Sequence, residues 1–278
     1  MKKTLALVLC LVMAFSLVLV GCNNTAGEDA GYKVLDESLA AEEYGIAFRQ
    51  GDALRDEVNN ALKVLKAEGK VAEVAEKWFG EDITTIVADA AALDAGYTEG
   101  RTLKVGLDDS FPPMGYRDEN NEIVGFDIDL AKAVCEKLGW GVEFVPIDWN
   151  AKEMELNSGN IDCIWNGMTL TEERKNTMNC SDPYLKNEQV LVVKANAGIE
   201  TLADLAGKNI ALQAGSSAEE ALKNATDLNA SIAAANTYAD NMYCFMDLNQ
   251  GASDAVLVDS IVANWYITSG QAENASAE

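Results

Sequence analysis

The chain has 278 residues, of which 45 are acidic and 21 basic, and its formal net charge is −24. A surface with this much negative charge repels the phosphate backbone of nucleic acids, so we expect no binding to nucleic acid. The chain has no histidine, which excludes His-based triads, His general bases and His metal sites. No catalytic residue, metal site or cofactor is predicted.

The first 21 residues have the pattern of a signal peptide. Two lysines precede an apolar stretch from Leu5 to Val20, as in export signals. The stretch ends in Leu19-Val-Gly-Cys22, which is similar to a lipobox and predicts lipid modification of Cys22. An uncleaved membrane anchor is the alternative. Residues 22–31 are small and polar and suit a flexible tether, so we expect an extracytoplasmic protein anchored to a bacterial membrane.

Two helices are predicted after the tether. Apolar residues recur at helical spacing in Asp52–Glu68 and again in Val71–Gly80, and Gly69 separates the two segments. Residues 81–100 are rich in Ala, Asp and Thr and contain no proline. We interpret them as a connector, and the sequence leaves its helicity open.

From Arg101 onward, strand patterns and helix patterns alternate. Strands are expected at Leu103–Leu107, Val142–Pro146, Ile161–Trp165, Gln189–Lys194, Asn209–Gln213 and Ala255–Val258, and helices at Asp127–Leu138, Lys152–Ser158, Thr171–Met178, Ala218–Asn224 and Ser260–Tyr266. This order favours an α/β fold with a mainly parallel sheet covered by helices. Residues 269–278 have little apolar surface to bury and are predicted to be a disordered tail.

The stretch Asn166-Gly-Met-Thr-Leu-Thr-Glu-Glu-Arg174 has the pattern of an anion site. Thr171, with acidic residues directly after it, predicts a capped helix start and places Arg174 at about the third helical position. The first turn of a helix leaves backbone N–H groups unpaired, and a guanidinium can hold a carboxylate through two bonds. Taken alone, the pattern also fits a surface arginine near a helix start.

The run Gly167–Lys175, followed by Ser181-Asp-Pro-Tyr184, resembles the signature of the polar amino-acid-binding proteins of ABC importers, bacterial solute-binding protein family 3. The resemblance implies the two-lobed periplasmic-binding-protein fold of type II. In that fold each lobe is a mainly parallel sheet flanked by helices, and two hinge crossings join the lobes. It also implies a monomer that captures a polar amino acid by lobe closure and delivers it to a membrane permease.

The order of the segments differs from that of the family. A segment like Tyr44-Gly-Ile-Ala47, followed by two helices and by Lys77-Trp-Phe-Gly80, closes the polypeptide in the family, but here it comes first. The family's usual start resembles Arg101–Met114. We therefore expect a circular permutation, which is tolerated when the old termini lie close together. The predicted pieces are residues 46–80 and 101–190 for lobe 1, 32–45 and 195–268 for lobe 2, and 191–194 for a hinge crossing.

The resemblance assigns the two charged ends of an amino acid to opposite lobes. Arg174, with Gly167 and Thr169, would bind the α-carboxylate. Asp259 would pair with the α-ammonium. Asp254 is the competing candidate, but it precedes the strand and has the position of a turn residue.

The predicted helix start near Ser216 is a further candidate. Ser216 and Glu219 have the spacing of a capping box, while the resemblance places ligand contacts at Ser216 and Ser217. A cap without a ligand role is the alternative reading of this pattern.

The remaining candidates surround the ligand side chain by resemblance. Phe111 and Trp149 would sandwich it and Asp108 would meet its distal end, which favours a cationic or amide side chain. Large aromatic residues near strand ends are also common in cores. The wall of the site would include three more positions, namely Asn166, Met168 and Gln213.

Some alternatives stay open. A cleft enzyme on the same fold, similar to a dehydratase, would need a carboxylic acid such as Asp108, and a ligand-sensing module is a third reading. Buried free thiols are the favoured reading of the four cysteines after Cys22, and Cys163 and Cys180 are the preferred pair if a disulfide exists. Asp127 is expected at a helix N-terminus, where its charge would only offset the helix dipole.

Overall fold

A computed structural model describes residues 31–269, and every structural statement below refers to these residues. The predicted signal peptide, Cys22, nearly all of the tether and the tail from residue 270 lie outside them. No helix within 31–269 has the length and apolarity that crossing a bilayer requires.

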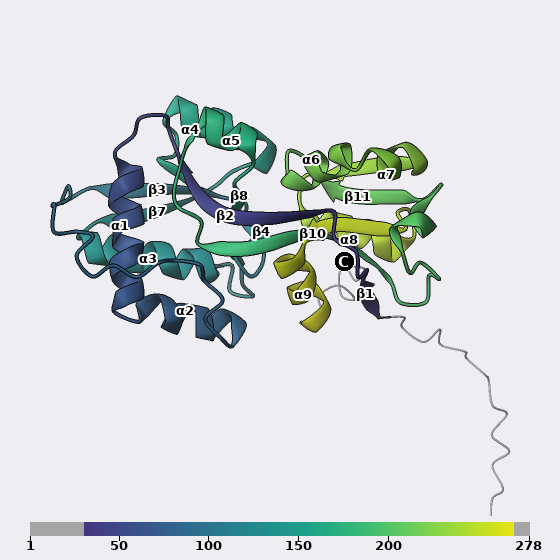
Figure 1. Ribbon diagram of the computed structural model, residues 1–278, viewed down its shortest axis with the longest axis horizontal. Coiled ribbons are helices and arrows are strands. Elements are labelled where there is room, and N and C mark those ends of the chain that lie inside the picture. The colour runs from purple at the N-terminus through teal and green to yellow at the C-terminus, as the bar shows by residue number, and fades with distance from the viewer. Residues whose placement is uncertain (1–30, 270–278) are drawn as a thin grey trace, which may run out of the picture. The chain divides into compact units, whose positions relative to one another are not determined.

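The fold is α/β, as predicted (Figure 1). The strands are β1 (Tyr32–Val34), β2 (Ala40–Phe48), β3 (Thr102–Leu107), β4 (Ser110–Phe111), β5 (Gly115–Arg117), β6 (Ile123–Val124), β7 (Gly141–Pro146), β8 (Cys163–Thr169), β9 (Asn179–Cys180), β10 (Leu185–Lys194), β11 (Asn209–Gln213), β12 (Ala234–Tyr238) and β13 (Ala255–Asp259). The helices are α1 (Leu54–Ala67), α2 (Lys70–Phe79), α3 (Phe126–Leu138), α4 (Lys152–Ser158), α5 (Glu172–Thr177), α6 (Ser217–Asn224), α7 (Thr226–Ser231), α8 (Asn241–Gln250), α9 (Ser260–Thr268) and the 3-10 turns η1 (Trp149–Ala151) and η2 (Leu202–Leu205).

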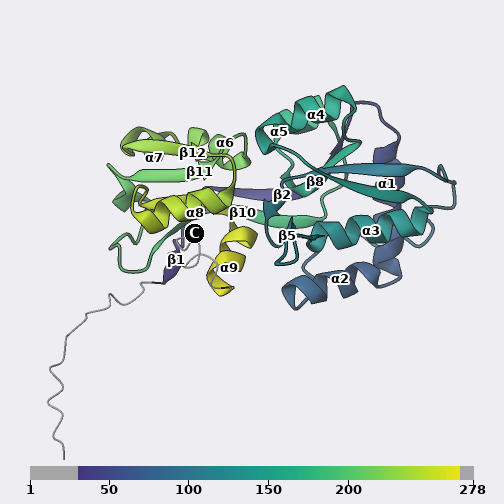
Figure 2. The same ribbon diagram turned by 180° about the vertical axis from the view of Figure 1, so that it is seen from behind.

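The main sheet joins two parallel groups through an antiparallel pair. Its order is β12-β11-β13-β10-β2-β8-β3-β7. β3 is parallel to β7 and β8, and β11 is parallel to β12 and β13, whereas β10 is antiparallel to both β2 and β13. Figures 1 and 2 show β2 and β10 running from one half of the molecule to the other.

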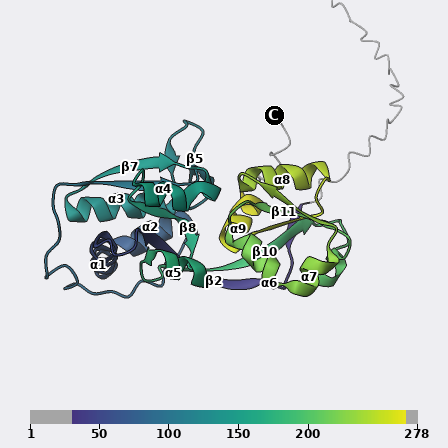
Figure 3. The ribbon, with the colours of Figure 1, turned by 90° about the horizontal axis from the view of Figure 1, so that it is seen from above.

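Helices cover both faces of each half, because the strands bury alternate residues on opposite faces. In β10, Val190 and Val192 pack in the same core cluster as Phe245 of α8, whereas Leu191 and Val193 pack in the cluster with the side chains of α6. In the other half, Trp165 faces the cluster containing α1 to α3, and Ile164 faces the cluster with α4. Figure 3 shows the two halves from above.

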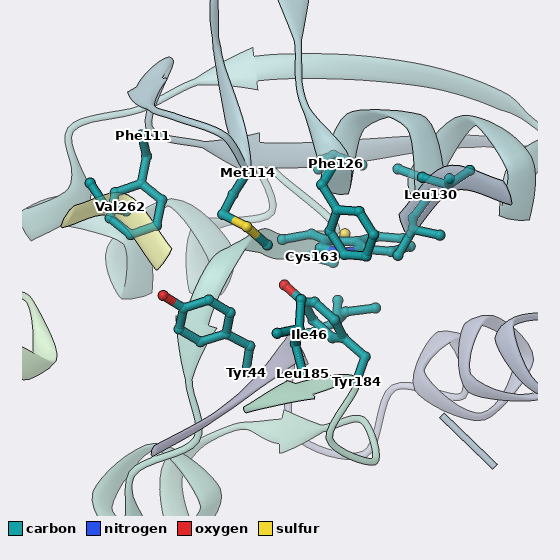
Figure 4. Close-up of a cluster of buried hydrophobic side chains, with 14 of the residues drawn as sticks. Tyr44, Ile46, Phe111, Met114, Phe126, Leu130, Cys163, Tyr184, Leu185 and Val262 are labelled. Carbon is teal, nitrogen blue, oxygen red and sulfur yellow. The ribbon is translucent and has the colours of Figure 1, made fainter. Parts of the chain in front are cut away.

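One cluster of buried side chains continues through both halves. Figure 4 shows part of it, with Tyr44 of β2, Phe111 of β4 and Val262 of α9. All three are nearly inaccessible to solvent. The strand pair β2 and β10 is therefore packed into the core on its way between the halves.

The two helices predicted near the start of the chain are present. Gly69, with φ 80°, separates α1 from α2, as the sequence indicates. The rings of Phe79 and Phe126 lie 4.8 Å apart, and those of Trp78 and Tyr116 lie 6.3 Å apart. The helix α2 thus packs onto α3 and β5, in the half that contains Arg174.

The connector at residues 81–100 is not helical. Thr84 forms an isolated β-bridge with Leu185, and the backbone N–H of Thr85 donates to the Tyr184 carbonyl. The cysteines at positions 135, 163, 180 and 244 are free, and only Cys180 is partly exposed. The Cys163–Cys180 disulfide is therefore absent from the structure.

The predicted end of the strand at Trp165 was wrong. β8 continues to Thr169, and its pairing with β2 shifts register between Ala47↔Ile164 and Gly45↔Met168. Gly167 lies inside this irregularity with φ 55°. A bulge of this kind redirects side chains while the strand continues, so the anion motif begins within the sheet.

Candidate functional site

Arg174 is a buried guanidinium at the start of a short helix. The Thr171 hydroxyl accepts from the Arg174 backbone N–H at 3.3 Å, so the predicted cap and the third helical position are confirmed. The side chain is 7% exposed. It donates to the Thr169 carbonyl at 2.9 Å and to the Gly215 carbonyl, in the other half, at 3.3 Å. Burial lowers its pKa, and no carboxylate of the described residues lies within ion-pair distance.

Asp259 is a buried carboxylate at the end of β13. Its Oδ1 accepts from the Tyr44 hydroxyl at 2.7 Å and from Asn187 Nδ2 at 2.6 Å. Burial, and then the nearby Glu42, raise the pKa of Asp259 to about 7. No lysine or arginine among residues 31–269 forms an ion pair with it. The carboxylate therefore has hydrogen-bond donors but no compensating cation.

A polar network connects the surroundings of these two groups. Glu42 Oε2 accepts from Thr169 Oγ1 at 2.9 Å, from Asn187 Nδ2 at 2.9 Å and from Gln189 Nε2 at 3.0 Å. The Ser217 hydroxyl lies 3.1 Å from Thr169 Oγ1 and 3.2 Å from Gln189 Nε2. Gln189 Oε1 is buried without a hydrogen-bond partner. Thr169 and Ser217 were predicted for the site, whereas Glu42, Asn187 and Gln189 were missed.

Asp108 joins the two halves at another point. Its Oδ2 accepts from Gln213 Nε2 at 2.6 Å, and its Oδ1 accepts from the backbone and hydroxyl of Ser110 at 2.9 and 2.7 Å. Burial raises the pKa of Asp108. The Asn166 amide lies 3.0 Å from both the Asp108 carbonyl and the Gly115 N–H, so it fixes the loop that follows β3.

The aromatic candidates are almost fully buried. A Cβ on Gly167 would lie 2.7 Å from the ring of Phe111, so that ring rests directly on the Gly167 backbone. Trp149 lies in η1 and shares an apolar cluster with Met168. Phe111 and Trp149 thus belong to two different clusters, and the cluster of Phe111 continues into the other half.

The predicted capping box at Ser216 was wrong. Ser216 is the N-cap residue of α6, but its hydroxyl donates back to the Gln213 carbonyl at 2.7 Å. Glu219 Oε2 accepts from the N–H of Gly215 instead, at 2.8 Å. The glutamate therefore holds the turn one residue earlier, and Ser217 is the serine that enters the polar network.

Asp127 accepts hydrogen bonds that its predicted place at a helix N-terminus did not indicate. It lies in the first turn of α3, as expected, but its Oδ2 accepts from the Gly167 N–H at 2.7 Å and from the Tyr184 hydroxyl at 2.8 Å. Burial raises its pKa to about 7. The prediction that its charge serves only the helix dipole was wrong, because the side chain anchors the bulge of β8.

Two hollows border the network. The larger, of about 660 Å³, is lined by Glu42, Thr169, Asn187 and Ser217 among others, and the second, of about 560 Å³, by Lys152, Arg174 and Gly215 among others. Both are of the size that small-molecule sites have. No group of acidic residues and cysteines within 31–269 has the arrangement of a metal site.

The arrangement is suited to a zwitterion. A buried charge is costly unless it is paired, yet a guanidinium and a carboxylate are both buried here without ion partners, at the two ends of one polar network. A small molecule with a carboxylate and an ammonium would compensate both. The fold and the site together define a two-lobed α/β protein of the periplasmic-binding type.

Comparison with known proteins gives the family. The model of the bacterial extracellular solute-binding proteins, family 3, matches residues 103–273. The chain belongs to this family. The matched region begins after α2, so the segment containing β1, β2, α1 and α2 lies outside it.

Relatives bind several amino acids. The chain is 34% identical over 178 residues to the L-cystine-binding protein TcyJ of Escherichia coli K12, a match that covers 63% of this chain and 65% of TcyJ, slightly less than two thirds. A substrate-binding protein of an ABC uptake transporter from Streptococcus pneumoniae, with bound histidine, is 41% identical with a TM-score of 0.60, over 62% of this chain and 72% of that one. An ancestral arginine-binding protein bound to arginine is 43% identical with a TM-score of 0.58, over 63% and 76%. All three are named as binding proteins.

Proposed function

We propose that this protein is the extracytoplasmic solute-binding component of an ABC importer, and that it captures a polar amino acid by lobe closure and delivers it to a membrane permease. The observation that carries the proposal is the pair of buried groups Arg174 and Asp259, which have no ion partners among the described residues. Their charges complement the carboxylate and the ammonium of a free amino acid.

The α-carboxylate is held by the Arg174 guanidinium, the backbone at Gly167 to Thr169 and the turn that starts α6. The Ser216 N–H of that turn donates to the Gln213 carbonyl at 3.4 Å, so the N–H groups that favour an anion are those of the first turn of α6, from Ser217 onward. The α-ammonium is held by Asp259. The unpartnered Gln189 Oε1 supplies a second acceptor, which fits a group that can only donate.

The ligand side chain meets Asp108, Gln213 and Asn166. Phe111 and Trp149 form apolar walls, and Met168 shares the apolar cluster of Trp149. A carboxylate and amides at the distal end favour a cationic or amide side chain over an acidic one. Arginine and histidine, which the two structural relatives bind, are of the cationic or polar kind.

The chain order is proposed to be a circular permutation. β2 lies inside the sheet between β8 and β10, and α1 and α2 pack on α3, although all three precede the region that the family model matches. In this proposal residues 32–80 are the family's final segment, residues 81–100 are the connector, and β2 and β10 are the hinge crossings. A signal peptide at residues 1–21 directs export, and a lipid on Cys22 tethers the monomer to the membrane.

Calorimetry and thermal shift with the common amino acids test the proposal. A ligand at 100 times its Kd adds about 2.7 kcal/mol to the free energy of unfolding, so at least one polar amino acid should raise Tm by several degrees. Arg174→Ala and Asp259→Asn should each weaken binding at least a hundredfold, since each leaves a charge of the ligand unpaired. Arg55→Ala, which removes a partly exposed arginine on α1, is the matched control.

The proposal fails if no amino acid stabilises the wild-type protein, or if Arg174→Ala binds as the wild type does. A dehydratase-like enzyme is the competing function. Its acid would have to be Asp108, whose carboxylate already accepts three hydrogen bonds, two from Ser110 and one from Gln213. Loss of a prephenate-like acid in an NMR assay with the purified protein would support the enzyme instead.

A further inference from the structure

Lys152 is a buried lysine that the proposed function does not use. It is the first residue of α4 and is 4% exposed, although lysine is among the residues least often buried without a partner. Its Nζ donates to the Gly215 carbonyl at 2.8 Å and to the Trp149 carbonyl at 3.2 Å, and lies 5.3 Å from the centre of the Trp149 ring. No carboxylate of the described residues forms an ion pair with it.

The Gly215 carbonyl accepts hydrogen bonds from two cationic side chains. Arg174 Nη2 also donates to it, at 3.3 Å, so a lysine and an arginine from one half of the molecule reach the same oxygen in the other. Burial, and then the charge of Arg174, lower the pKa of Lys152 to about 8. Neither cation has another hydrogen bond to the second half among residues 31–269.

The absence of a side chain at Gly215 allows this close contact. Its φ is +66°, and a Cβ there would lie 2.7 Å from Asn150 Oδ1 and 3.0 Å from Asn150 Cα. The backbone of Gly215 therefore lies directly against the segment that starts α4.

We infer that Lys152 is a positioning residue, which fixes the turn Gln213–Ser217 against Arg174 so that the start of α6 and the guanidinium form one carboxylate-binding site. The inference rests on the proposed function. The Gly215 carbonyl belongs to the peptide that leads into α6, so a bond to it fixes the orientation of that peptide and the start of the helix, while the Ser216 N–H donates to the Gln213 carbonyl at 3.4 Å. Without the lysine, the Gly215 carbonyl would keep only the longer bond from Arg174, and the ends of the turn would keep the bonds of Gln213 to Asp108 and of Ser217 to Thr169.

Binding kinetics of Lys152→Met test this role. Methionine keeps the length and the apolar stem but removes the charge and the donor. For the amino acid that stabilises the wild type most, we expect Kd to rise about tenfold, equivalent to about 1.4 kcal/mol, with most of the change in the dissociation rate. Lys223→Met is the matched control, because Lys223 lines the same hollow but has no hydrogen bond or ion pair across to the other half. It should stay within twofold of the wild type.

A double-mutant cycle with Gly215→Ala separates positioning from direct contact with the ligand. If Lys152 acts through the Gly215 carbonyl, Lys152→Met should add little to Gly215→Ala, because the added Cβ already displaces the turn. If the lysine instead grips the ligand itself, the two effects add, and that result overturns the inference. An unchanged Kd and dissociation rate in Lys152→Met also overturns it.

Small-angle scattering of the ligand-free proteins gives a readout that needs no ligand. Lys152→Met should have a larger radius of gyration than the wild type and Lys223→Met, because one of the two bonds from Gly215 to the first half is lost. If no amino acid binds the wild-type protein, the proposed function fails, and the scattering alone decides whether Lys152 holds the turn. Equal radii of gyration for Lys152→Met, Lys223→Met and the wild type would reject the role of Lys152 in holding the turn.

Discussion

At the scale of single residues, buried charge is the feature that most directly indicates function. Arg174, Asp259 and Asp127 are all at most 7% exposed, and none has an oppositely charged partner among the described residues. Burial of such groups lowers stability unless a ligand or a hydrogen-bond network compensates it. For Arg174 and Asp259 we propose that the ligand compensates the charge. For Asp127 the compensation is structural.

The first prediction concerns Asp127. Its pKa is raised from 3.8 to about 7 by burial, so the folded state binds the proton more tightly than the unfolded chain. Its contribution to stability is therefore complete below about pH 4 and is lost as the pH rises to about 7. At 1.36 kcal/mol per pKa unit this amounts to at most about 4 kcal/mol.

Asp127→Asn should remove the contribution of this carboxyl to the fall in the free energy of unfolding between about pH 4 and pH 7. Urea denaturation at pH 4.5 and 7.5 measures the free energy of unfolding, and the drop between the two values should be smaller in the variant than in the wild type. Asp129→Asn, two positions along the same helix and at a partly exposed carboxylate, should retain the drop. Equal drops in wild type and Asp127→Asn would show that this carboxyl is not the one that titrates.

The sequence could predict those site residues that lie within local motifs. Arg174 and Thr171 follow from a helix-start pattern, and the resemblance points to Thr169, Ser217 and Asp259, which the structure brings into one region. Their roles as ligand contacts remain predictions. Glu42 was missed because its partner Thr169 lies 127 residues away, and no local pattern encodes such a contact.

At the scale of elements, the bulge in β8 is where the fold brings several residues of the candidate site together. The register shift lets Asn166 and Gly167 leave the regular alternation, and the Asp127 side chain fixes the bulge from α3. The sequence predicted a turn after Trp165, since glycine within an apolar run is typical of turns. The strand instead continues because β2 supplies pairing partners beyond the bulge.

The second prediction concerns Gly167→Ala. The backbone has φ +55°, and the new Cβ would lie 2.7 Å from the Phe111 ring, so the substitution combines backbone strain with overpacking. We expect it to lower the free energy of unfolding by about 2–4 kcal/mol and to weaken amino-acid binding. Denaturant unfolding and calorimetry measure the two effects.

Gly207→Ala is the control for that substitution. Gly207 has φ +71°, but nothing lies within 4 Å of the Cβ position, so only the backbone cost of about 1–2 kcal/mol should appear. Similar losses at the two positions would mean that the contact between Gly167 and Phe111 adds nothing to stability.

Other elements gave no usable signal in the sequence. The helices α7 and α8 and the strand β12 were not predicted. β12 is an edge strand whose residues are all at least partly exposed, so it lacks the apolar alternation by which strands are recognised. The strands β11 and β13 were predicted to within a residue, because their apolar runs are continuous and almost fully buried. β3 and β7 were also predicted to within a residue, although β7 is an edge strand without a fully buried residue.

At the scale of the whole molecule, β2 and β10 hold the two halves together. Both are long strands, they pair with each other, and each also pairs with a strand of one half, β8 for β2 and β13 for β10. The family and the α/β fold class were confirmed, whereas the permuted order and the extents of the lobes remain predictions.

The third prediction tests the permuted order. A rearranged chain with residues 32–80 placed after Thr268, and the connector 81–100 removed, would have the order expected for the family. If the permutation is correct, this chain should fold and bind the same amino acid within about threefold of the original Kd, since the packed core is unchanged. Circular dichroism and calorimetry check the two parts, and an aggregated or non-binding product would contradict the permutation.

The central place of β2 has a consequence for how the chain is made. The strand is synthesised early, but its neighbours in the sheet, β8 and β10, come from the second half of the chain. The middle of the sheet therefore cannot form until most of the polypeptide has emerged, and contacts so distant in sequence slow folding. The second half of β2, from Tyr44 to Phe48, is buried in the folded protein, and while it is unpaired it is open to association with other strands.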